Sequence, residues 1–86
     1  MRVRTEKTVN FTRRGLKRDI LKEAKVLDMA PGYAEAIADI AVEKVAKWAE
    51  KRAAITEGDL DRIVSDKIKP YSTELSFVFK ERGKII

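Results

Sequence analysis

Apolar residues recur at helical spacing from the start of the second ten-residue block. They lie within about a quarter-turn of one another at 100° per residue, and they are Leu16, Ile20, Ala24 and Leu27. Thr12 stands just before the pattern and can accept a hydrogen bond from a free backbone N–H of the first turn. The pattern predicts a first helix over residues 12–27.

The segment "DMAPGY" interrupts the pattern, and a longer amphipathic stretch follows it. One wide arc of this stretch is apolar and consists of Tyr33, Ile37, Ile40, Ala41, Val45 and Trp48. The opposite side carries Glu35, Asp39 and Glu43. These positions predict a second helix over 31–52. Aromatic residues at this spacing are usually buried, so we expect Tyr33 and Trp48 to lie in the core.

Two shorter helices are expected after the second one. Thr56 with Asp59 three positions later is a variant of the capping box, and Pro70 ends the apolar pattern, so a helix is predicted over 57–69. Ser72 can cap a last helix over 72–82. The β-prone residues at positions 77–79 leave a terminal strand as the alternative.

Residues 1–11 alternate weakly between polar and apolar side chains and include β-branched residues. The alternation predicts a short hairpin that turns near residues 5–7, although no Asn-Gly or Asp-Gly marks the turn. The expected fold is therefore mainly α (α+β), with a short N-terminal β-hairpin packed on a three- to four-helix bundle. All 86 residues fit one small domain.

Composition removes most kinds of chemistry. The chain has no Cys and no His, so a thiolate nucleophile, an imidazole base and the usual zinc sites are excluded. It also has no glycine-rich phosphate loop. We therefore expect a protein that is not an enzyme and holds no structural metal. No apolar run approaches the roughly 18 residues of a membrane helix and no signal-peptide pattern opens the chain, which favours the cytoplasm.

Charge is concentrated near the N-terminus. Residues 1–27 hold nine lysines and arginines and three acids, a net +6, whereas the whole chain carries +5. The start of the first helix holds Arg13, Arg14, Lys17 and Arg18, the wrong sign for the positive end of a helix dipole. A bound phosphate would make this arrangement of charges favourable, because phosphate binds both helix N-termini and basic side chains. A nucleotide polyphosphate or a nucleic-acid backbone fits, and a merely solvated charged face is the alternative.

The order of these elements resembles the ATP-cone, a small nucleotide-binding module of ribonucleotide reductases, their transcriptional repressor and 2-phosphoglycerate kinase. The stretches that carry the resemblance are "VNFTRRGLKRDI", "YAEAIADIAVEKV", "ITEGDLDRIVSDKI" and "ELSFVFKERGK". The sequence departs from the family in two places: the turn at 4–7 has no glycine, and Gly15 stands where the family has lysine.

The resemblance implies ATP or dATP as ligand, with Mg²⁺ accompanying the phosphates. It implies that Val3 and Val9 face the base, with Arg4 or Lys7 as the hairpin cation. Thr56 would mark the start of the third helix, and a lysine of the closing segment would lie near the phosphates. With the basic cluster of the first helix, the candidate nucleotide-binding residues are Val3, Arg4, Lys7, Val9, Arg14, Lys17, Arg18, Thr56 and Lys80, with Lys84 as an alternative to Lys80.

Other functions stay open. The family also implies a partner, either a catalytic protein or a second copy of the chain. The stretch "VAKWAEKRAAITEGDLDRIV" is similar to part of a histone fold, which would make the same basic face a nucleic-acid-binding surface. A middle helix shorter than that fold requires, and the acidic row on it, weigh against this alternative. A protein-interaction module without a ligand is the third possibility.

Overall fold

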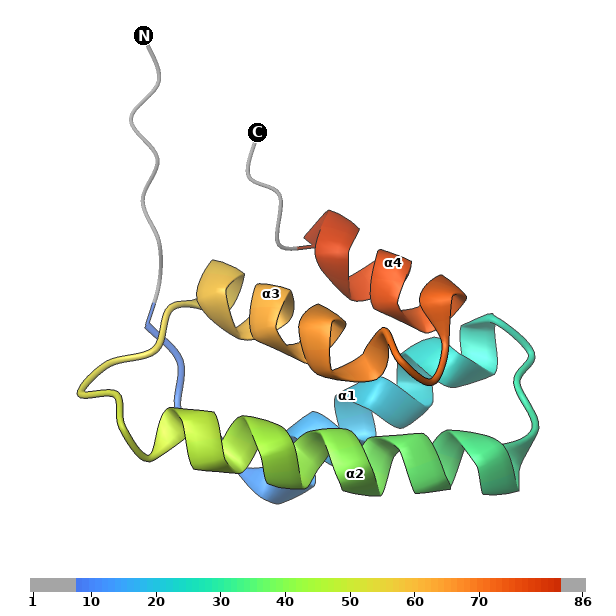
Figure 1. Ribbon diagram of the computed structural model, residues 1–86, viewed down its shortest axis with the longest axis horizontal. Coiled ribbons are helices and arrows are strands. Elements are labelled where there is room, and N and C mark those ends of the chain that lie inside the picture. Colours follow the sequence, from blue (N-terminus) through green and yellow to red (C-terminus); the bar gives the residue numbers. More distant parts are fainter. Residues whose placement is uncertain (1–7, 83–86) are drawn as a thin grey trace, which may run out of the picture.

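The computed structural model describes residues 8–82, which form four α-helices (Figure 1). They are α1 (Arg13–Val26), α2 (Pro31–Ala49), α3 (Glu57–Ile68) and α4 (Thr73–Arg82). Helix α1 packs mainly on α2, and α3 packs mainly on α4. Helix α2 runs along the length of the molecule, with α3 antiparallel to it, so α2 joins the two helix pairs.

Three of the helices begin where a hydroxyl side chain can cap them. The Oγ1 atom of Thr12 accepts from the N–H of Gly15 at 3.0 Å, and Thr56 and Ser72 cap α3 and α4 in the same way. Helix α2 has no side-chain cap and begins with Pro31, whose missing N–H needs no partner there. Helix α2 ends at Ala49, earlier than the expected Arg52. The alternative of a terminal strand is wrong, because residues 77–79 lie inside α4.

The expected α+β fold with a β-hairpin is wrong, because residues 8–82 contain helices and no strand. The segment before α1 makes one isolated antiparallel bridge, from Thr8 to Thr56. Next to it, the N–H of Val9 donates to the carbonyl oxygen of Ile55 at 2.9 Å. The extended segment therefore pairs with the loop before α3. The other arm and the turn of the expected hairpin, residues 1–7, lie outside the described residues.

The core is a single cluster that contains residues from all four helices. Its largest fully buried side chains are Phe79, Ile20, Ile68, Leu75, Val45 and Val64. The structure describes no helix that is both long enough and apolar enough to cross a membrane.

The expected burial of Tyr33 is wrong, because this residue is 52% exposed. Its hydroxyl donates to the carbonyl oxygen of Tyr71 at the molecular surface. Trp48 is half-buried and packs against the edge of the core. Ile37, Ala41 and Val45 of the expected arc are buried. The rest of the buried face consists of small residues such as Ala38 and Val42 in place of Tyr33 and Ile40. These small side chains let α1 and α3 both approach α2. A prediction based on large apolar residues does not identify such a face.

Candidate functional site

The expected nucleotide-binding residues that fall within residues 8–82 do not come together in one site. Val3, Arg4 and Lys7 lie outside the described residues. Thr56 uses its hydroxyl to cap α3, with Oγ1 3.2 Å from the N–H of Asp59. Lys80 lies on α4 and lines a separate pocket between α3 and α4. Of the expected set, Val9 alone lines a pocket next to the start of α1.

The cations at the start of α1 divide into two groups. The Arg13 Nε atom lies 3.1 Å from Glu43 Oε2, and Lys17 Nζ lies 3.0 Å from Asp39 Oδ1 and 4.0 Å from a Glu35 oxygen. The hydrogen bond to Asp39 raises the pKa of Lys17 above its usual value. The acidic row of α2 therefore offsets two of the four unfavourable charges.

Arg14 and Arg18 form the second group and are exposed on α1. Helical spacing places them with Lys22 and Lys25 on the side opposite the buried Leu16. Within residues 8–82, neither arginine has a carboxylate partner. This outer stripe gives α1 an unneutralised positive face that is directed toward solvent.

A pocket of about 420 Å³ lies between the segment that leads into α1 and the segment that leaves α2. We call it the N-terminal pocket. Its apolar wall includes Phe11 and Ile55, and its charged groups are Arg13, Arg52 and Glu50. Its remaining lining residues are Val9, Asn10, Thr12, Ala46, Ala49, Ala53 and Ala54. The pocket exists because the Val9–Ile55 hydrogen bond holds the two segments together.

The candidate ligand contacts predicted from the sequence did not include Arg13, Arg52 or Phe11, which line this pocket. The sequence predicted a helix through residue 52, whereas α2 ends at Ala49 and residues 50–55 form an irregular loop. Ala53 and Ala54 are a weak sequence signal of this pocket, since small side chains leave space for a ligand beside the backbone. No local pattern links them to Phe11, because the contact depends on how the chain folds back.

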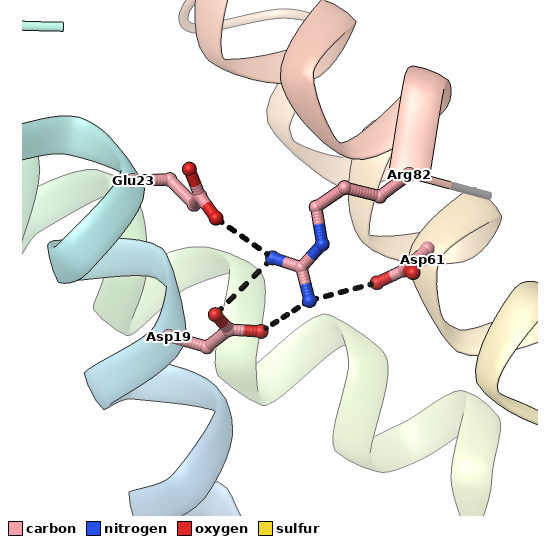
Figure 2. Close-up of polar contacts among 4 residues, drawn as sticks. All are labelled: Asp19, Glu23, Asp61 and Arg82. Carbon is pink, nitrogen blue, oxygen red and sulfur yellow. Dashed lines mark hydrogen bonds and ion pairs between the residues drawn. The ribbon is translucent and has the colours of Figure 1, made fainter. Parts of the chain in front are cut away.

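A cluster of charges joins α1, α3 and α4 around Arg82 (Figure 2). The Arg82 guanidinium donates to both carboxylate oxygens of Asp19, at 3.1 and 2.9 Å, and to Glu23 at 3.2 Å. Asp61 Oδ1 lies 3.5 Å from the same guanidinium. In the part of the chain that the structure describes, no group of acidic side chains is arranged to hold a metal ion. Because its members come from α1, α3 and α4, the cluster is a clamp between helices, with Arg82 at its centre.

Asp61 is the most buried carboxylate of this clamp, with its side chain 9% exposed. Burial raises the pKa of Asp61 to about 6, against the opposing attraction of Arg82. The folded state therefore binds a proton at Asp61 more readily than the unfolded chain does. This group's contribution to stability is full below about pH 4 and is lost as the pH rises through about 6.

Replacing Asp61 with asparagine should remove this pH dependence. We expect D61N to be at least as stable as the parent protein at pH 7.5. The asparagine does not place a charge in this buried position, and Arg82 retains its ion pairs with Asp19 and Glu23. At pH 4.5 the parent protein should gain about 1–3 kcal/mol relative to D61N. Urea unfolding of both proteins at pH 4.5, 6.0 and 7.5 measures this difference. A D61N protein that is clearly less stable at pH 7.5 would contradict it.

Comparisons of the chain with protein-family models, curated proteins and solved structures found no match.

Proposed function

We propose that this domain binds a nucleoside triphosphate of the ATP or dATP type in the N-terminal pocket. One observation carries the proposal: Arg13 and Arg52, from two different segments, line the same pocket as an apolar wall. The base and sugar would lie against Phe11 and the alanines. The phosphates would lie against the Arg13 guanidinium and the start of α1. The Arg52 guanidinium, which lies over the Trp48 ring, would turn from that ring to reach them.

The dimensions and chemistry of the pocket suit such a ligand. Its volume of about 420 Å³ is within the roughly 300–1,000 Å³ usual for small-molecule sites. Arginine binds phosphate through two parallel hydrogen bonds, and the dipole of α1 adds positive potential at the same end. Glu43 holds Arg13 at 3.1 Å through an exposed ion pair. A phosphate can replace that carboxylate at small cost, since exposed ion pairs contribute little.

The resemblance to the ATP-cone supports the same ligand and suggests a regulatory rather than a catalytic role. A catalytic protein or a second copy of this chain would respond to the bound nucleotide. Mg²⁺ would accompany the phosphates. A nucleotide ligand also favours the cytoplasm. The exposed Arg14 and Arg18 would attract the anion over a distance without contacting it. Lys17, which is paired with Asp39, and Lys80 are not part of this proposed site.

Titration calorimetry with ATP tests the proposal through two neighbouring arginines. We expect Arg13→Gln to weaken ATP binding at least tenfold, because it removes a phosphate contact. Arg14→Gln removes the same charge from the outer stripe and should weaken binding less than about threefold. One ATP should bind per chain, and ADP should bind more weakly.

Equal losses in the two variants would contradict this site, because they would indicate a general charge effect. Binding of duplex DNA that weakens steeply with salt, with no response to ATP, would favour the nucleic-acid alternative instead.

A further inference from the structure

Trp48, the chain's only tryptophan, lines a second pocket. We call it the tryptophan pocket. Its volume is about 490 Å³, and its lining is Lys44, Lys47, Trp48, Lys51, Arg52 and Lys67. Every lining residue except the tryptophan is a cation. Sequence reasoning missed this group, because residues 28–86 together carry a net charge of −1.

Helix α2 and the loop that follows it supply most of the pocket. Positions 44, 47 and 48 lie on one face of α2, and Lys51 follows in the turn directly after the helix ends at Ala49. Lys67 comes from α3, which runs antiparallel to α2 beside it (Figure 1). The pocket therefore lies along the C-terminal part of α2, with Trp48 and the lysines in its lining.

These cations have few negative partners. Lys67 has Asp66 at 3.8 Å, and Lys44 lies 3.5 Å from the Tyr71 hydroxyl. Lys47 and Lys51 have no carboxylate partner within residues 8–82. The Arg52 guanidinium lies over the Trp48 ring, 4.7 Å from its centroid.

The helix dipole explains only part of this arrangement. Cations near the C-terminus of a helix are favourable, and Lys47 lies in the last turn of α2. The dipole does not require that Lys67 of another helix lines the same pocket, nor that an aromatic ring lies in a pocket whose other lining residues are all cations. Their mutual repulsion is unfavourable in the empty protein and is relieved when a polyanion binds.

We propose that the tryptophan pocket binds single-stranded nucleic acid. Lys44 and Lys47 of α2 and Lys51 just after it contact successive phosphates, and an unpaired base stacks on Trp48. The exposed Arg52 moves from the indole ring to a phosphate. Basic grooves with an aromatic platform bind single strands in this way, whereas the bases of a duplex are already stacked on each other. This surface is distinct from the proposed nucleotide site and shares only Arg52 with it.

Tryptophan fluorescence tests the proposal directly, because Trp48 is the only tryptophan that can report stacking. Addition of a 12-nucleotide oligo(dT) or oligo(U) should quench the emission to a saturating level. Contacts with about three phosphates predict that the logarithm of the affinity falls with the logarithm of the salt concentration with a slope of about −2. A duplex of the same length should bind more weakly and quench less.

A pair of variants with the same change in charge locates the surface. The double variant Lys47→Gln/Lys51→Gln should weaken oligonucleotide binding at least tenfold in a fluorescence-polarisation titration. Lys22→Gln/Lys25→Gln removes two charges from α1 and should weaken binding less than about threefold. Trp48→Phe should keep the fold and retain most of the binding, whereas Trp48→Ala should lose it.

Several outcomes would overturn the proposal. They are the absence of quenching, equal losses in the two double variants, equal binding of inorganic tripolyphosphate, equal binding of an acidic peptide, and tighter binding of the duplex. Arg13→Gln separates this proposal from the nucleotide site, because it should leave oligonucleotide binding unchanged. If oligonucleotide binding falls with Arg13→Gln as much as with Lys47→Gln/Lys51→Gln, the two surfaces are not separate and the proposal fails.

Discussion

Replacing Phe79 with alanine is expected to lower the free energy of unfolding by about 3–5 kcal/mol. Phe79 is fully buried and belongs to the core cluster that joins all four helices. Its removal would leave a cavity where α4 packs on α3. A domain of 86 residues has a total stability of only about 4–13 kcal/mol. The variant should therefore unfold at much lower urea concentration and temperature.

Phe77 provides the control for this prediction. It lies in the same helix and is 60% exposed. Phe77→Ala should change stability by less than about 1 kcal/mol, because little apolar surface leaves the core. Urea unfolding followed by circular dichroism compares the two variants. Similar losses at the two positions would show that α4 does not pack through the face that contains Phe79.

Replacing Arg82 with alanine is expected to cost about 2–3 kcal/mol. The change would leave Asp19, Glu23 and Asp61 close together without their cation, and it would remove the guanidinium that lies over the Phe79 ring at 4.7 Å. Breaking a buried ion pair costs about 3–5 kcal/mol. We expect less here because a third of the Arg82 side chain is exposed to solvent, which screens the charges.

Lys80→Ala is the matched control, since Lys80 is an exposed cation of the same helix. It should change stability by less than about 0.5 kcal/mol. Adding D61N to Arg82→Ala should restore part of the loss, because one of the three carboxylates is then neutral. Thermal and urea unfolding at pH 7.5 measure all four proteins. An Arg82→Ala variant as stable as Lys80→Ala would show that the clamp contributes nothing.

The parts of the fold that local chemistry determines were predictable from the sequence. Thr12, Thr56 and Ser72 cap the helices as expected, because a cap depends on residues within one turn. The predicted hairpin was wrong because the pairing of an extended segment depends on residues distant in the chain. A residue such as Val9 can pair with any extended segment that folding brings near, and its partner is Ile55.

The site was less predictable than the helices. The sequence identified unusual cations at the start of α1, and helical spacing separates Arg14 and Arg18 from Arg13 and Lys17. Only the packing of α2 shows that the latter two face carboxylates. The two pockets combine residues from segments distant in the chain. Their composition follows from tertiary contacts, which no single-segment pattern contains.

The helix packing also affects how fast the chain folds. Helix α1 packs on α2 and α3 on α4, so most contacts join neighbours in sequence. Such local topology is typical of domains that fold in microseconds to milliseconds. The Val9–Ile55 hydrogen bond and the Arg82–Asp19 contact instead close long loops. Because closing a long loop costs entropy before its contacts form, we expect these two links to form last.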